Sequence, residues 1–359
     1  MSFLRQLLVS VVVGVLTAGI CHAGGSAPVE SQTQELLNTC SINAGVCCIP
    51  ACGQGDLAVE LARQSEFLIL AMDEDPANVA AAREKAAEAG LLGRQLYVEQ
   101  GTPEAIPFAD NYVDLLVLSD VREADLSEAL RAEIMRVLTP IHGTAVLADG
   151  KIVKPELEGS DWWFHKRHDP GNNPVSEDTI FQFPPVLQYK AMPMYSAFQQ
   201  ATLTGNGIQV EINPWDYEKF GIRLNLCGRI FGRSVYNGRI LWEATTPWRI
   251  TPTRPTSVLT EDELLIAREE QGGIARFGLL TGEERDPIEI GDAETRIRWL
   301  AHEKGVLFTL IGKPGSMMIP FDWKGWRFRR EFPGTKKEQF YGNELAAWSL
   351  KDEKVLWKH

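Results

Sequence analysis

Long apolar runs are scarce in this sequence of 359 residues. After Ile20, none approaches the roughly 20 apolar residues that a membrane-spanning helix needs. Basic residues are also in the minority, with 36 Lys and Arg against 48 Asp and Glu, and no dense Lys/Arg patch offsets the net charge of −12. Such a surface repels phosphate backbones, so nucleic-acid binding is not expected.

Cysteines are few, and they fit no familiar metal or haem pattern. Their spacing matches no common zinc site, and no Cys-x-x-Cys-His haem attachment site is present. Four of them lie within thirteen residues, at Cys40, Cys47, Cys48 and Cys52, and Cys227 lies far along the chain. Two interpretations stay open: a local disulfide, for example from Cys40 to Cys47 or Cys48, or small buried residues on a strand.

The first 23 residues have the three parts of a secretory signal peptide. Arg5 supplies the positive charge, an apolar run extends from Leu7 to Ile20, and small residues surround Ala23. We expect cleavage after Ala23, an exported protein that is periplasmic or extracellular, and no membrane span after cleavage. The alternatives are an uncleaved membrane anchor and lipidation at Cys21.

The remaining composition is that of a folded protein, with 44% hydrophobic and 23% charged residues, and its length suggests two domains. Between residues 30 and 150, short apolar runs alternate with amphipathic stretches, which predicts a Rossmann-type α/β domain. We expect strands at 45–50, 67–72, 95–99, 113–118 and 144–148, and helices at 56–65, 76–89 and 125–138. The last helix is expected to begin at Asp125, with Glu128 completing a capping box.

The first strand-to-helix turn, IPACGQGDLAVELA, carries the chemistry of this domain. Gly53 and Gly55 allow a ligand to approach the backbone, and the following helix offers free N–H groups. Asp73 ends the next strand, 18 residues after Gly55. This is close to the roughly 20-residue spacing at which a carboxylate meets ribose hydroxyls in dinucleotide-binding folds.

Three stretches resemble the class I S-adenosylmethionine-dependent methyltransferases: ACGQG, MDEDPANVAAAREKA and TPEAIPFADNYVDLLVLSD. The resemblance implies a methyltransferase-like fold that binds S-adenosylmethionine, with a methyl acceptor that the sequence does not name. The positions that match the family's cofactor contacts are Cys52, Gly53, Gly55, Asp73 and, less closely, Thr102.

The sequence departs from the family pattern at several contacts. Ile49 stands where the family has an acid in its first strand, Ala51 replaces the first loop glycine, and Thr102 stands where an Asp often lies near the adenine. Asp120 ends the fourth expected strand, where it either faces the cleft as a catalytic acid or caps the following turn.

After Asp149, Trp, Pro and Gly become frequent, and short apolar runs separated by turns replace the helical pattern, which predicts an all-β region. Hairpin turns are expected at Asn237–Gly238, at Gly282 and at Gly325. The glycines are 44 and 43 residues apart, within the roughly 40 to 50 residues of a four-stranded propeller blade.

These repeats, YNGRILWEA and LAAWSLKDEKVLWK among them, resemble those of pyrroloquinoline-quinone-like (PQQ-like) β-propellers. The segment DWWFHKRHDPGNNPVSEDTI is similar to the first propeller strand of planctomycete-type exported proteins that join a methyltransferase-like domain to such a propeller. The matching positions are Asp161, Trp163, His165, His168, Asp169, Asn172 and Asn173. His165, His168 and Asp169 suggest either a metal site or a structural role that fixes this loop by hydrogen bonds.

We therefore expect a signal peptide at 1–23, a methyltransferase-like Rossmann domain at 30–150, a linker and first propeller strand at 151–180, and a partial, truncated PQQ-like propeller at 181–359. Three functions stay open. The first is an S-adenosylmethionine-dependent methyltransferase, although that cofactor is made in the cytoplasm. The second is a redox quinoprotein that uses pyrroloquinoline quinone with calcium. The third is a non-enzymatic exported binding or scaffold protein whose partner is an unknown small molecule or protein.

Overall fold

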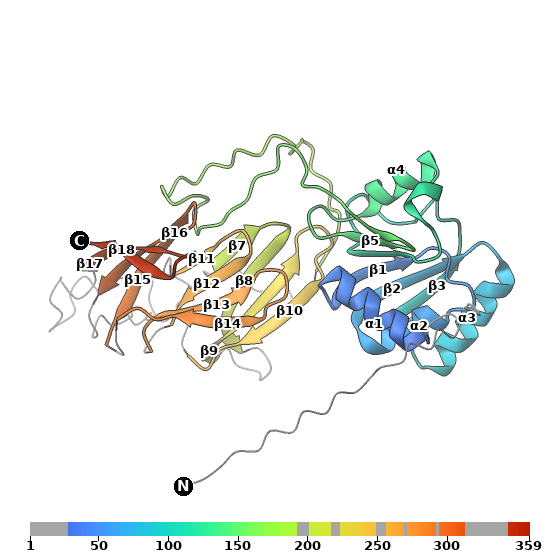
Figure 1. Cartoon of the computed structure of the whole chain (residues 1–359), viewed down its shortest axis with the longest axis horizontal. Helices are drawn as coiled ribbons and strands as arrows, with labels where there is room; N and C mark the ends of the chain where they lie inside the picture. The colour runs from blue at the N-terminus through green and yellow to red at the C-terminus, as the bar shows by residue number, and fades with distance from the viewer. Residues whose placement is uncertain are drawn as a thin grey trace, which may run out of the picture.

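The structure is a computed structural model that describes residues 28–191, 201–216, 223–248, 256–268, 271–291, 294–312 and 344–359. The expected signal peptide and the expected turn at Gly325 lie outside these residues. No helix among the described residues is long and apolar enough to cross a membrane. The α/β domain and the later sheets lie side by side along the longest axis of the molecule (Figure 1).

The first domain is built on a six-stranded mixed sheet in the order β3-β2-β1-β4-β5-β6. All neighbouring strands are parallel except β6, which pairs antiparallel with β5. The strands are β1 (Ala44–Ile49), β2 (Glu66–Asp73), β3 (Leu96–Gln100), β4 (Leu115–Leu118), β5 (Thr144–Leu147) and β6 (Gly150–Val153). The helices are α1 (Val29–Cys40), α2 (Asp56–Gln64), α3 (Pro76–Glu88) and α4 (Glu128–Val137), with a short 3₁₀ turn η1 (Glu123–Asp125).

Helices cover both faces of this sheet, as the alternation of apolar and amphipathic segments predicts. One core joins the sheet to α1, α2 and α3, and a second core joins the opposite face to α4 (Figure 1). Because successive residues of a strand point to opposite faces, Cys47 lies in the first core and Cys48 in the second. Cys47 and Cys48 are fully buried and Cys40 is nearly so, and all three are free thiols, so no disulfide joins them. The side chain of Cys227 lies outside the described part.

The predicted strands and helices of the first domain are confirmed within a few residues, but the sequence did not predict α1 or β6. β6 extends the first sheet three residues past the expected domain boundary at 150. The predicted cap of the third helix is wrong. Asp125 ends η1, and α4 is capped by Ser127, whose Oγ accepts from the Leu130 amide at 3.0 Å. The extended backbone of Leu126 separates Asp125 from the helix, and no capping box with Glu128 forms.

The second region contains three antiparallel sheets of four strands each among the described residues. The first comprises β7 (Ala201–Gly205), β8 (Ile208–Asp216), β9 (Arg223–Ser234) and β10 (Ile240–Thr245). The second comprises β11 (Ser257–Leu259), β12 (Glu263–Ala267), β13 (Ile274–Gly278) and β14 (Glu284–Ile288). The third comprises β15 (Arg296–Glu303), β16 (Val306–Gly312), β17 (Glu344–Ser349) and β18 (Lys354–Lys358).

These sheets contact one another through their first strands, because β11 lies against both β7 and β15. Trp242 of the first sheet packs on the second, where its Nε1 donates to the Leu279 carbonyl oxygen at 2.9 Å. The hairpin turns predicted at Asn237–Gly238 and at Gly282 are confirmed, with positive φ at both glycines. Within the described residues of the second region the all-β prediction is confirmed, and no closed propeller is seen there.

A buried hydrogen-bond network joins the two regions. Asp114, which precedes β4 and is fully buried, accepts from the amide of Val46 at 2.7 Å and from Asn237 Nδ2 at 2.8 Å. Asn237, in the turn between β9 and β10, also donates to the Tyr112 carbonyl oxygen. His142 Nε2 lies 3.0 Å from the same Asp114 carboxylate. The second region is therefore joined to the first through a buried carboxyl group, and removing its hydrogen-bond donors would destabilise the fold.

Candidate functional site

The topology of the first sheet places a ligand site at one edge. The chain leaves β1 toward β2 on one side, while β4 lies on the other side of β1. In open α/β sheets, ligands bind beyond the carboxyl ends of the strands at such a switch in strand order. The loops after β1 and β4 meet there, and they contain the predicted residues Cys52, Gly53, Gly55 and Asp120.

The two glycines of the loop after β1 have different roles. Gly55, with a φ of +85°, precedes α2, and a Cβ at this position would lie 2.7 Å from Ala82 Cβ of α3. It therefore allows close packing of the loop on α3. Gly53, with a φ of +54°, has open space where a Cβ would stand. Its backbone is the part of the loop that a ligand can approach.

Asp73 at the end of β2 faces this loop. Its Oδ2 accepts from the Gly53 amide at 2.8 Å, and its Oδ1 accepts from the Asp75 amide and from Asn78 Nδ2. Partial burial disfavours the charged form, but these three hydrogen bonds outweigh it and hold the pKa of Asp73 below its ordinary value. Asp73 is thus an ionised acceptor at the sheet edge, which suits a ribose hydroxyl.

Cys52 and Thr102 complete the predicted set. The Cys52 amide donates to the Met72 carbonyl oxygen at 2.8 Å, which places the loop next to the end of β2. Burial, with a smaller contribution from the Asp73 carboxylate, raises the pKa of the Cys52 thiol to about 11, so this cysteine is a neutral packing group. Thr102 follows β3 and lies one residue beyond Gly101, whose amide donates to the Asp73 carbonyl oxygen. The structure therefore brings all five predicted cofactor residues to one edge.

The positions that depart from the family pattern lie at the same edge. Ile49, the last residue of β1, is 2% exposed and offers no polar group. Asp120 follows β4 and is exposed, and neither a hydrogen bond nor an ion pair of its side chain occurs within the described residues. Next to it, Ser119 Oγ accepts from Gln32 Nε2 of α1 at 3.3 Å, so α1 reaches this edge. The alternative prediction, that Asp120 caps the following turn, is supported by no hydrogen bond of its side chain among the described residues.

The sequence interpretation missed Asp114 and its partners. Asp114 lies inside the stretch that resembles the family, yet its neighbours in sequence gave no sign that Asn237, 123 residues away, would contact it. A charged residue directly before the apolar run Leu115–Leu118 is the one available signal, because a buried carboxylate at a strand end requires donors.

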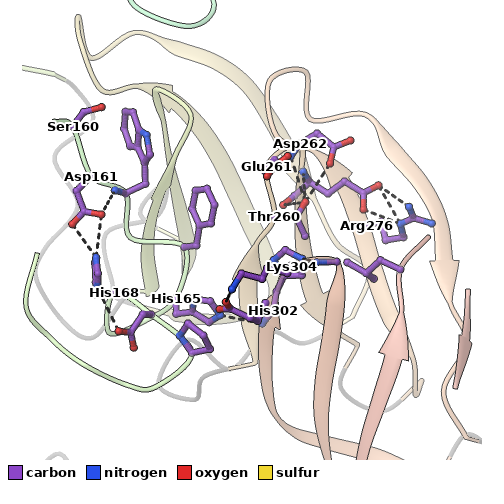
Figure 2. Close-up of a pocket in the computed structure, with 18 of the residues that line it drawn as sticks. Ser160, Asp161, His165, His168, Thr260, Glu261, Asp262, Arg276, His302 and Lys304 are labelled. Atoms are coloured by element: carbon purple, nitrogen blue, oxygen red, sulfur yellow. Dashed lines mark hydrogen bonds and ion pairs between the residues drawn. The ribbon is translucent and has the colours of Figure 1, made fainter. Parts of the chain in front are cut away.

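A second groove, of about 690 Å³, lies where the segment 160–170 meets the turn between β11 and β12 and the turn between β15 and β16 (Figure 2). His168 Nε2 lies 2.9 Å from Asp161 Oδ2, and its Nδ1 lies 3.7 Å from Asp169 Oδ2. Among the described residues, no group of three or more His, Cys, Asp or Glu side chains is placed to hold a metal ion. The bond between His168 and Asp161 supports the structural role considered for this segment.

Comparison with known proteins agrees with this description of the first domain. Residues 50–141 match the family described as "Methyltransferase domain". The ubiquinone/menaquinone biosynthesis C-methyltransferase UbiE of Yersinia pestis is 34% identical over 111 residues, which are 30% of this chain and 42% of that protein. UbiE of Yersinia enterocolitica matches to the same extent. The chain thus spans less than half the length of these relatives. The first domain is of methyltransferase type, with a Rossmann-like fold.

Solved structures give similar matches. A putative S-adenosyl-L-methionine-dependent methyltransferase from Methanococcus maripaludis is 30% identical and covers 33% of this chain and 54% of its own, with a TM-score of 0.30. The [4+2]-cyclase SpnF is 26% identical and covers 33% of this chain and 43% of its own, with the same TM-score.

Proposed function

We propose that the first domain binds S-adenosylmethionine at the edge formed by the carboxyl ends of β1, β2 and β4 and acts as a methyltransferase. The observation that carries this proposal is the ionised Asp73 carboxylate, 2.8 Å from the amide of Gly53, with open space beside that glycine. Asp73 would hold the ribose hydroxyls, and the Gly53 backbone would lie against the nucleoside. The cofactor, when bound, supplies an electrophilic methyl group.

The chain's own groups then orient an acceptor. Asp120 is the exposed carboxylate after β4, and in this proposal it would accept a hydrogen bond from an acceptor hydroxyl or amine. Because Ile49 provides no charge for the methionine amino group, we expect weaker cofactor binding than in a site with an acid there. The proposal names only the chemical class of the methyl acceptor: a nucleophile small enough to reach the Asp120 carboxylate.

Calorimetry on the full chain tests this proposal. We expect S-adenosylmethionine to release heat with the wild-type protein, and the Asp73→Asn variant to bind at least about tenfold more weakly, since an amide cannot accept all the bonds that Asp73 now accepts. Glu74→Gln, one residue away and exposed, is the matched control and should bind as the wild type does. No heat with S-adenosylmethionine up to about 1 mM would overturn the proposal and favour a non-enzymatic scaffold.

Export remains part of the proposal, since residues 1–23 have the pattern of a signal peptide. Cleavage of this peptide predicts that the chain in its native cell has an N-terminus at Gly24, which Edman or mass-spectrometric sequencing checks.

The redox alternative finds no support at the second groove. The calcium that this quinone cofactor would need has no ready site there, because no group of three or more His, Cys, Asp or Glu side chains among the described residues is placed to hold a metal ion.

A further inference from the structure

The two oxygens of the Asp73 carboxylate are surrounded unequally by hydrogen-bond donors. Oδ1 accepts from the Asp75 amide at 3.0 Å and from Asn78 Nδ2 at 3.1 Å. Within the described part of the chain, Oδ2 accepts from one group alone, the Gly53 amide, at 2.8 Å. The two oxygens therefore differ in what they can still bind.

The number of lone pairs on a carboxylate limits how many further donors it can accept. An ionised carboxylate offers about four lone-pair positions, two on each oxygen. The Asp75 amide and the Asn78 side chain occupy both positions of Oδ1. The Gly53 amide occupies one position of Oδ2. One acceptor position of Asp73 is therefore open, and it belongs to Oδ2.

The first turn of α3 fixes the two donors on Oδ1. Asp75 is the N-cap of this helix, and its side chain accepts from the Ala77 amide at 2.8 Å. Asn78, half-buried, is the third residue of the helix. Its amide must direct Nδ2 to Asp73, because its oxygen in that place would meet a second acceptor. A ligand hydroxyl could reach Oδ1 only by displacing one of these two donors.

The donor on Oδ2 belongs to the accessible loop after β1. Gly53 has open space where a Cβ would stand, and the Asp73 side chain is partly exposed. Oδ2 is thus bonded to the part of the loop that a ligand can approach, whereas Oδ1 is bonded to the start of α3. The open acceptor position and the open space lie on the same loop.

We propose that Asn78 determines how this site recognises a ribose. By occupying Oδ1, Asn78 restricts Asp73 to one hydroxyl of the ribose diol, which donates to Oδ2. Asn78 is a positioning residue, since it acts through Asp73. The inference rests on the proposed S-adenosylmethionine site, and it narrows the contact of Asp73 with the ribose hydroxyls to one of them.

Calorimetry of the full chain with S-adenosylhomocysteine and with its 2′-deoxy and 3′-deoxy analogues tests this inference. Each analogue lacks one ribose hydroxyl, so only one of them loses the bond to the charged Oδ2. With the wild-type protein, we expect one analogue to bind at least about tenfold more weakly than the parent compound. The other should bind within about threefold of the parent compound.

The Asn78→Ala variant tests the role of Asn78 itself. It frees a lone pair of Oδ1, so the second hydroxyl gains an acceptor. The analogue that the wild type tolerates should now bind at least about fivefold more weakly than the parent compound. Ala favours a helix more than Asn does, so the variant should fold, which far-UV circular dichroism checks. Glu84→Ala, at an exposed position of the same helix, is the control and should keep the wild-type ratio of affinities.

Two kinds of failure are distinguishable in these titrations. If neither S-adenosylmethionine nor S-adenosylhomocysteine binds the wild type up to about 1 mM, the proposed function is wrong and this inference is overturned with it. If the parent compound binds but both deoxy analogues bind equally well, cofactor binding stands and single-hydroxyl recognition is wrong. An unchanged ratio of affinities in Asn78→Ala would likewise overturn the role of Asn78 alone.

Discussion

At the scale of single residues, His165 and His302 make the stability of the second region sensitive to pH. Burial lowers the pKa of both from the ordinary value of 6.5, so between that value and the lowered one the unfolded chain binds more protons than the folded chain. Stability is therefore complete above about pH 6.5 and decreases as the pH falls below it. The nearby Asp169 and Glu303 carboxylates oppose this shift.

We predict that the His165→Gln variant loses part of this pH dependence. Gln supplies an oxygen near the place of Nε2, which can still accept from the His302 amide, but it does not titrate. Urea unfolding at pH 7.5 and at pH 5.5 should show a smaller difference in unfolding free energy for the variant than for the wild type. An unchanged difference would mean that His165 does not titrate in this window.

The residues at the cofactor edge show what sequence patterns can predict. Gly53, Gly55 and Asp73 were found because their spacing follows from the geometry of a strand, a turn and a helix. The different roles of the two glycines were not predictable, since they depend on Ala82 of α3. The tautomer of His165 was equally unpredictable from the sequence, because it is set by the backbone amide of His302, which lies 137 residues away.

At the scale of elements, the residue that caps the N-terminus of α4 differs from the one that the sequence pattern predicts. Ser127 caps the helix, and Asp125 lies in η1 without a capping bond. We predict that Ser127→Ala lowers the free energy of unfolding of the first domain by about 1 kcal/mol, while Asp125→Ala changes it by less than about 0.5 kcal/mol. Urea denaturation followed by circular dichroism at 222 nm measures both. The reverse order would restore Asp125 as the cap.

The contact between the first two β-sheets provides a second test at this scale. Gly282 lies in the turn between β13 and β14, and a Cβ there would overlap the indole ring of Trp242. Gly305 has a similar positive φ, but open space surrounds its Cβ position. We predict that Gly282→Ala destabilises the protein by about 1–3 kcal/mol more than Gly305→Ala, because only the former forces Trp242 to move. Equal losses in thermal unfolding would show that the Trp242 contact is dispensable.

Elements of the first domain were predictable because their apolar periodicity matches their burial. β1 and β4 are apolar and buried along their whole length, as expected for central parallel strands. α1 was missed because only a few of its twelve residues are buried. β6 was missed because it is an exposed edge strand, which needs no apolar pattern.

At the scale of the whole molecule, hydrogen bonds around Asp114 join the two regions, and we expect them to couple the unfolding of the two regions. The side chain of Asn237 is 5% exposed and donates across the junction to Asp114 and to the Tyr112 carbonyl oxygen. Gln188 also bridges the regions, from Nε2 to the carbonyl oxygens of Asp110 and Tyr236, but it is exposed. Buried bonds to a charged group stabilise more than exposed ones, because water replaces only the latter.

We therefore predict that Asn237→Ala lowers stability by about 1.5–3 kcal/mol and that Gln188→Ala lowers it by less than about 0.5 kcal/mol. Since the lost bonds join two cores, Asn237→Ala should also separate the calorimetric unfolding of the two regions into two transitions, or widen an existing separation. Differential scanning calorimetry of wild type and both variants measures this. If Asn237→Ala instead shifts both regions equally and keeps their transitions together, Asp114 stabilises β1 and β4 without linking the two regions.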